Sequence, residues 1–313
     1  MPADIAADVT SSSVTQQLRC GVIVMGRLKQ PTVQTRRVVG QALSKLAAQL
    51  EQGMSQGFRT YLKAMARFHR YSSCNVLLIA MQQPTATRVA GYRTWQKLGR
   101  QVRQGERGIQ IMAPVVHRMK TTEGADEEDD EDTEILSGFR PTHVFDVSQT
   151  EGRPLPEPSR VQGNAEEHLN RLEAWVVRQD IKLEYAPWLG PTEGMSTGGR
   201  ILLYSRLDAS QAFSVLVHEL AHEMLHQQEK LPKTVRETEA EAVAFVVCEA
   251  SGLESSTASS DYIQLYRGDK EMLLGSMKRI HRTAGEIIRG IGVGDGITLG
   301  SAVPPHEQVG VAA

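Results

Sequence analysis

Hydrophobic positions recur at helical intervals through the first half of the chain. Between residues 36 and 70 the apolar side chains follow the three-to-four-residue spacing of amphipathic helices, interrupted at Gly53 and Gly57, which predicts two helices. The stretch NVLLIAMQQ follows two serines, so we expect a short buried helix with a serine cap that ends before Pro84. GYRTWQKLGR predicts another short helix that ends at Gly99.

Alternating and extended patterns follow these helices. QVRQGERGIQIMAPVV predicts a hairpin with Gly105 and Gly108 in its turn. A run of acids then interrupts the pattern, and THVFDVSQT resumes it. A segment of such polarity cannot enter a core. We therefore expect the acids to form an excursion between two paired strands.

The pattern beyond the proline-rich stretch GRPLPEPSR is mainly helical. It predicts helices over residues 165–179, at ASQAFSVLVHELAHEMLHQQ, over 235–250 and over 270–288, with one strand at RILLYS. The fold class is therefore α+β, with two domains. We expect a flexible tail at 1–35 holding at most one short strand at 20–25, an N-terminal α+β domain at 36–150 with an acidic loop at 121–138, a linker at 151–163, and a mainly helical domain with a small sheet at 164–313.

Composition indicates a globular, cytoplasmic protein. Hydrophobic residues make up 40% and charged residues 23% of the chain, and no stretch approaches the roughly 20 apolar residues of a membrane helix. The first residues lack the basic start and apolar block of a secretory signal. Cys20, Cys74 and Cys248 are odd in number and widely spaced, so we expect reduced thiols. Because no long apolar stretch is present, we also expect no membrane partner.

Charge is distributed unevenly along the chain. Between Arg36 and Lys120 there are 15 Lys and Arg against two acids, whereas nine acids crowd residues 123–134. Aromatic residues are interleaved with these cations, as in proteins that hold single-stranded nucleic acid by base stacking. The alternative for the aromatics is a place in the core. The candidate DNA contacts are Arg88, Tyr92, Arg93, Trp95, Lys97, Arg100, Arg103 and Arg107.

The stretch VLVHELAHEMLH carries candidate metal chemistry. On a helix, His218 and His222 point the same way and Glu219 lies beside them. Two neutral imidazoles bind zinc well, and a catalytic zinc takes a third protein ligand and activates a water molecule. The surrounding residues are apolar, so polar side chains here need a partner. We therefore expect His218 and His222 to bind Zn²⁺, with Mn²⁺ as the alternative ion, and Glu219 to act as general base.

The sequence leaves several acids of the next helix as candidates for the third ligand. A metzincin would carry a histidine at position 228, which is glutamine. ETEAEA instead offers Glu237, Glu239 and Glu241 at the start of an apolar helix. We favour Glu239 because it shares a face with small and apolar residues that could pack against the histidine helix. His226 lies one turn beyond His222, so we expect it behind the ligands or at the surface.

Long motifs in both halves resemble the ArdC-type antirestriction proteins of conjugative plasmids. YSSCNVLLIAMQQPTATRVAGYRTWQKLGRQVRQGERGIQIMAPV and VFDVSQTEGRPLP resemble the family's N-terminal region that binds single-stranded DNA. GMSTGGRILLYS, LVHELAHEMLH and ETEAEAVAFVVCEASGL resemble its zincin-like metallopeptidase region. The resemblance covers residues 36 to 290, and the acidic run and the first 35 residues depart from it.

This resemblance implies an antirestriction protein that binds single-stranded DNA and protects incoming plasmid DNA. It also implies a C-terminal zinc metallopeptidase-like domain of the HExxH, gluzincin-like type, with His218, His222 and a glutamate of ETEAEA as ligands and Glu219 as base. An alternative is an active DNA-associated zinc protease that cleaves DNA-bound or regulatory proteins. A third is a binding module whose metal is structural.

Overall fold

The computed structural model describes most of the chain. The described residues are 23–24, 33–53, 55–119, 133–155, 164–227, 231–253, 262–265 and 269–293. Most of the expected tail, the acids of residues 123–132 and most of the expected linker lie outside these ranges. Within them, helices and strands combine into a mixed architecture in which the helical patterns of the sequence are confirmed almost element by element.

Four helices form the first part of the fold. They are α1 (Val33–Glu51), α2 (Gln56–Arg67), α3 (Ser73–Gln82) and α4 (Tyr92–Lys97). The break at Gly53 and Gly57 separates α1 from α2, as expected. The hydroxyl of Ser72 accepts a hydrogen bond from the Asn75 N–H at 3.3 Å and caps α3. Seven of the ten residues of α3 are buried, and five of these are apolar, so this short helix is held by packing.

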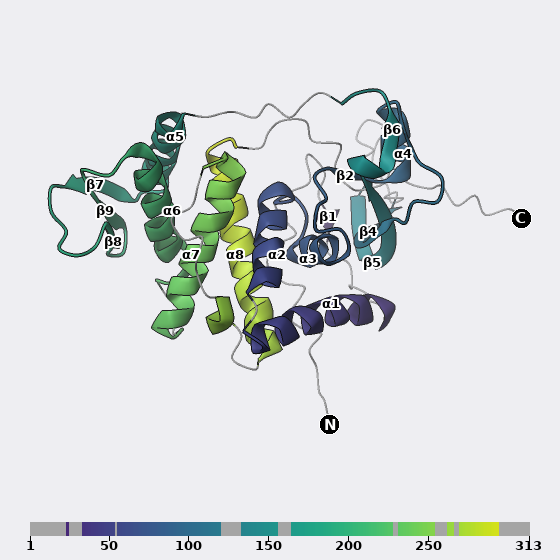
Figure 1. Ribbon diagram of the computed structural model, residues 1–313, viewed down its shortest axis with the longest axis horizontal. Coiled ribbons are helices and arrows are strands. Elements are labelled where there is room, and N and C mark those ends of the chain that lie inside the picture. Colours follow the sequence, from purple (N-terminus) through teal and green to yellow (C-terminus); the bar gives the residue numbers. More distant parts are fainter. Residues whose placement is uncertain are drawn as a thin grey trace, which may run out of the picture.

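A sheet built around one long strand lies beside these helices (Figure 1). β4 (Ile109–Met119) pairs antiparallel with β5 (Thr133–Asp146) along its whole length. β1 (Ile23–Val24) and β2 (Val89–Ala90) pair with opposite ends of β5. Residues 120–132, which hold most of the acids, therefore connect two paired strands, as the sequence predicts.

The expected hairpin at QVRQGERGIQIMAPVV is wrong. β3 (Arg100–Val102) pairs with β6 (Thr150–Gly152), which follows the short helix η1 (Val147–Gln149), and not with β4. The guanidinium of Arg100 reinforces this pairing, since it donates to the hydroxyl and carbonyl oxygens of Thr150 at 2.8 and 2.9 Å. Local alternation predicts a strand but does not identify a partner 50 residues away.

The second half combines four helices with a three-stranded sheet. The helices are α5 (Ala165–Arg178), α6 (Ala209–Leu225), α7 (Lys233–Ser251) and α8 (Lys270–Gly290), with the short η2 (Tyr262–Leu265) before α8. β9 (Arg200–Tyr204) lies between β7 (Lys182–Ala186), to which it is parallel, and β8 (Gly194–Ser196), to which it is antiparallel. β8 and β9 both contact α6.

Helix α7 lies between α6 and α8 (Figure 1). It packs against α6 on one side and against α8 and α2 on others, and α2 stands beside α7 and α8 in Figure 1. Buried apolar residues from both halves form one continuous cluster. Among the helices that the structure describes, none is long and apolar enough to cross a membrane. The division at residues 151–163 stays a prediction.

Candidate metal centre

Helix α6 presents its two histidines beside a buried face. The Asp208 carboxylate accepts a hydrogen bond from the Gln211 N–H at 2.9 Å, and this cap begins the helix. Leu216, Leu220 and their apolar neighbours are buried in the core. His218 and His222 project from the helix together, with side chains 22% and 15% exposed, because they are four residues apart. Both rings can therefore be reached from solvent.

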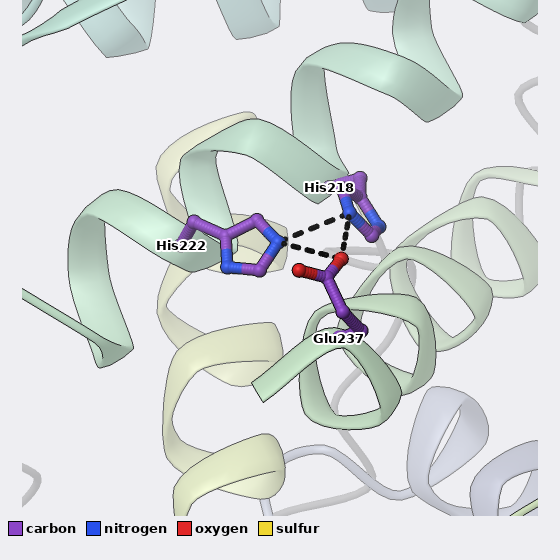
Figure 2. A group of neighbouring side chains, drawn as sticks. All are labelled: His218, His222 and Glu237. Carbon is purple, nitrogen blue, oxygen red and sulfur yellow. Dashed lines mark hydrogen bonds and ion pairs between the residues drawn. The ribbon is translucent and has the colours of Figure 1, made fainter. Parts of the chain in front are cut away.

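The two histidines meet a carboxylate from α7. The Nε2 atoms of His218 and His222 lie 3.1 Å apart, and Oε2 of Glu237 lies 3.6 and 3.4 Å from them. Figure 2 shows the three side chains converging from the two helices. Ligands bound tetrahedrally at zinc distances are about 3.3 Å apart, so one cation fits against all three atoms. Within the described ranges, this is the one group of three such ligands.

The electrostatic environment keeps His222 and Glu237 in the forms that bind cations. Burial, aided by the field of His218, lowers the pKa of His222 to about 4, so the ring stays neutral at physiological pH. A hydrogen bond with His218 lowers the pKa of Glu237 to about 2, aided by Lys233 and by the charge that His222 gains in acid, although burial opposes them. A neutral imidazole and an ionised carboxylate are the ligand forms that metals require.

Our preference for Glu239 is corrected by this geometry. The Glu239 carboxylate is fully buried and contacts His226, Ser276 and Arg279 instead of the histidine pair. Residues two apart on a helix are separated by about 200° around its axis, so Glu237 and Glu239 cannot serve the same site. Small and apolar neighbours mark the buried face of α7, where Glu239 lies. His218 and His222 instead contact the half-exposed side of this helix, where Glu237 lies.

His226 lies behind the ligands rather than at the surface. It ends α6, and its side chain is 2% exposed. Its Nδ1 lies 3.0 Å from Nδ1 of His222, on the side of that ring opposite the ligand triangle. The sequence left this position open, and burial at the junction of α6 with α7 decides it.

Glu219 follows His218 on α6 and interacts electrostatically with both His218 and Glu237. Burial raises the pKa of its carboxyl group, and a hydrogen bond from the Ser196 backbone partly opposes this effect. Strand β8 runs against α6 at this point, because Gly194 leaves no side chain between them. A Cβ there would lie 2.8 Å from Cγ of Glu219 and 2.6 Å from Cγ1 of Val215. The closeness of β8 to the site was not predicted from the sequence.

No role for Glu223 was predicted from the sequence. Its carboxylate accepts hydrogen bonds from the Gly198 and Gly199 N–H groups at 2.8 and 2.7 Å. Both glycines have positive φ, at 75° and 79°, in the turn between β8 and β9. Glu223 therefore ties this turn to α6, one residue after a metal-binding candidate. The two adjacent glycines after GMST were the sequence signal that could have predicted this turn.

The candidate DNA contacts divide into structural and surface residues. Trp95 is corrected, since it is fully buried and donates from Nε1 to the Phe145 carbonyl at 2.9 Å. The guanidinium of Arg100 donates to the backbone carbonyls of Thr150 in β6 and of Arg153 just after it. Arg103 pairs with Glu106 at 2.6 Å. Arg88 is half-buried. The side chains of Tyr92, Arg93, Lys97 and Arg107 are exposed.

A surface hollow lies beside helix α4. It has a volume of about 650 Å³ and lies between α4, β3 and β6, with Gln96, Arg100, Gln101 and Glu151 in its walls. Tyr92, at the start of α4, is 44% exposed and packs edge-on against Phe145. A partly exposed ring beside cations is the arrangement that stacks bases in single-strand-binding proteins.

Comparisons with known proteins match both the first part of the chain and its overall fold. The family of the N-terminal domain of the anti-restriction factor ArdC matches residues 34–145. The crystal structures of the antirestriction ArdC protein from plasmid R388, metal-free and Mn(II)-bound, superpose with TM-scores of 0.52 and 0.53. They are 17% and 18% identical to this chain, and each alignment covers 81% of it and 97% of the R388 protein.

A relative of greater length is also similar. An uncharacterized protein of Bacillus anthracis is 28% identical over 274 residues, which cover 72% of this chain and 46% of that protein. The chain therefore spans about half the length of this curated relative. At this level of identity the solved structures establish the fold that the chain shares with them.

Proposed function

We propose that this chain is an ArdC-type antirestriction protein, since its residues 34–145 match the family of the ArdC N-terminal domain. It binds a divalent cation at His218, His222 and Glu237, and single-stranded DNA through its N-terminal half. The observation that carries the proposal is the triangle of three ligand atoms, 3.1 to 3.6 Å apart. Support comes from the R388 ArdC protein of the same fold, which has a Mn(II)-bound form.

The site combines ligands with a proton acceptor. A cation bound there would act as a Lewis acid and lower the pKa of a coordinated water. Glu219 lies next to His218 in the sequence, and burial raises the pKa of its carboxyl group. It is therefore suited to take a proton and return it to a leaving group. The Ser196 backbone holds this carboxylate in place.

Metal titration tests the site directly. We expect Mn²⁺ or Zn²⁺ to bind the full chain with one ion per molecule in calorimetry. The His218→Ala variant should lose this binding. The Glu219→Gln variant should keep it, because Glu219 is a base and not a ligand. A wild-type chain that folds and takes up neither ion contradicts the proposal.

An active protease is the second candidate function, and the position of β8 favours it. Among described strands β8 pairs only with β9, so its other edge can add an extended peptide beside Glu219. Incubating wild type and Glu219→Gln with unfolded and DNA-bound proteins tests this. Cleavage by the metal-loaded wild type alone supports a protease, and absence of cleavage leaves the DNA-protecting function.

DNA binding is supported by the exposed cations and by Tyr92 on and near α4. If Arg93 and Lys97 contact phosphates, replacing both by alanine should weaken binding of a thymidine oligonucleotide. The slope of log affinity against log salt should fall by about one for each cation removed. Arg206→Ala, which removes an exposed arginine of the second half, serves as the control. Equal effects of both changes contradict a DNA site at α4.

A further inference from the structure

A series of buried side chains extends from the ligand triangle into the core. His222 turns its Nε2 toward His218 and Glu237, while its Nδ1 lies 3.0 Å from Nδ1 of His226. The other ring nitrogen of His226, Nε2, lies 3.2 Å from Oε2 of Glu239. The side chains of His226 and Glu239 are 2% and 0% exposed, so water does not compete for these contacts.

The protons of this series can point in only one consistent direction. A histidine that offers Nε2 to a cation keeps its proton on Nδ1. His222 therefore donates from Nδ1, and His226 accepts at its own Nδ1. With that nitrogen accepting, His226 carries its proton on Nε2 and donates to Glu239, whose carboxylate accepts. Each contact then joins one donor to one acceptor.

Helix α8 fixes the far end of the series. Nε of Arg279 donates to both oxygens of Glu239 at 3.2 and 3.1 Å, and the Ser276 hydroxyl also donates to this carboxylate. Burial by itself raises the pKa of Glu239, but the hydrogen bonds from His226, Arg279 and Ser276 hold it at about 2. A buried carboxylate with this many donors has a defined position.

We propose that His226 and Glu239 are positioning residues for His222, which hold the Nδ1–H form of its ring and its direction toward the cation. This inference rests on the proposed cation site. A ligand histidine is typically held through its second nitrogen, and loss of that partner costs about 10–100-fold in metal affinity. Here the partner is a second histidine, His226. Through Glu239 it links the ring of His222 on α6 to Arg279 on α8.

Cobalt binding to the full chain tests the proposal, because the visible absorption of bound Co²⁺ depends on the arrangement of its ligands. His226→Leu removes both ring nitrogens at similar volume. We expect its Kd for Co²⁺ to rise about 10–100-fold and its absorption bands to shift. His226→Gln keeps one acceptor and one donor at similar reach, so it should recover part of the affinity. Arg279→Met, which frees Glu239, should weaken binding in the same direction.

His168 provides a matched control. It is a buried histidine, 1% exposed, that packs on Phe213 of α6 with ring centroids 6.2 Å apart. Neither of its ring nitrogens has a hydrogen-bond partner among the described residues. His168→Leu removes a buried imidazole beside the same helix without changing the series. We expect its Co²⁺ affinity and absorption to equal those of the wild type.

The possible results distinguish the positioning role of His226 from the cation site itself. Wild-type affinity and absorption in His226→Leu overturn the positioning role, and so does equal weakening in His226→Leu and His168→Leu. If His226→Leu does not fold, unchanged affinity in both His226→Gln and Arg279→Met overturns it. A wild type that binds no Co²⁺, Mn²⁺ or Zn²⁺ contradicts the cation site itself. If the wild type binds the ion and the variants bind it with the same affinity, only the positioning role is contradicted.

Discussion

Glu237 and Glu239 lie two residues apart on α7, and their carboxylates contact different histidines of α6. Oε2 of Glu237 lies 3.4 Å from Nε2 of His222, whereas Oε2 of Glu239 lies 3.2 Å from Nε2 of His226. The Glu237 side chain is 43% exposed and the Glu239 side chain is fully buried. One helix therefore supplies both a carboxylate at the open face of the candidate metal site and a carboxylate that supports it from behind.

The first prediction concerns the third ligand. Glu237→Gln should weaken Mn²⁺ or Zn²⁺ binding by more than the roughly 10–100-fold typical of residues behind the ligands, because a charged oxygen ligand is lost. Glu241→Gln, one turn further along α7 and near Tyr262, is the control and should leave the affinity unchanged. Calorimetric titration of both variants measures this. Equal affinities in wild type and Glu237→Gln contradict the assignment.

The second prediction separates two aromatic residues of α4. Trp95→Ala should lower the free energy of unfolding by about 3–5 kcal/mol, because the indole is fully buried and its hydrogen bond to Phe145 is lost. Tyr92→Ala should cost much less stability, since this ring is 44% exposed. It should instead weaken binding of single-stranded oligonucleotides, by about 1–3 kcal/mol for one stacked base. Urea unfolding and fluorescence anisotropy measure the two effects, and loss of DNA binding without loss of stability in Trp95→Ala runs against this assignment.

The third prediction concerns the turn between β8 and β9. Glu223→Ala removes the acceptor of two backbone N–H groups, so we expect a loss of about 1–3 kcal/mol of stability. Hydrogen exchange at Gly198 and Gly199 should become faster. Glu193→Ala, an exposed glutamate just before β8, is the control and should change neither quantity. Unchanged exchange in Glu223→Ala shows that the carboxylate does not hold the turn.

The fourth prediction is the pH dependence of the metal-free protein. Burial lowers the pKa of His222 and of His281 to about 4, against an ordinary value of 6.5. Between these values the unfolded chain binds protons that the folded chain does not, so stability present above pH 6.5 is lost as the pH falls toward 4. The lowered pKa values of Glu237 and Glu239, about 2, add a further loss below pH 4.5.

Urea unfolding between pH 8 and pH 5 measures this dependence. His281→Gln removes one of the titrating groups, so the slope of stability against pH should fall by up to about 1.4 kcal/mol per pH unit. His143→Gln, which replaces an exposed histidine of β5, is measured beside it as the control. A stability that stays constant from pH 7 to pH 5 would refute the assignment.

Much of the helical structure could be predicted because its signals are local. Apolar spacing, the serine cap before α3 and the glycine breaks each act within a few residues. The association of His218 with His222 is also local, since four residues of helix place both rings on one side. The acidic run between β4 and β5 was predictable because nine acids cannot be buried.

The sequence by itself determined the helices, the histidine pair and the acidic connection. Only the tertiary structure decided which glutamate meets the histidines, that Trp95 lies in the core, and that β3 pairs with β6. The reason is that these outcomes depend on how one element is rotated and placed against another. That orientation is set by packing across the whole core, and no single segment carries it.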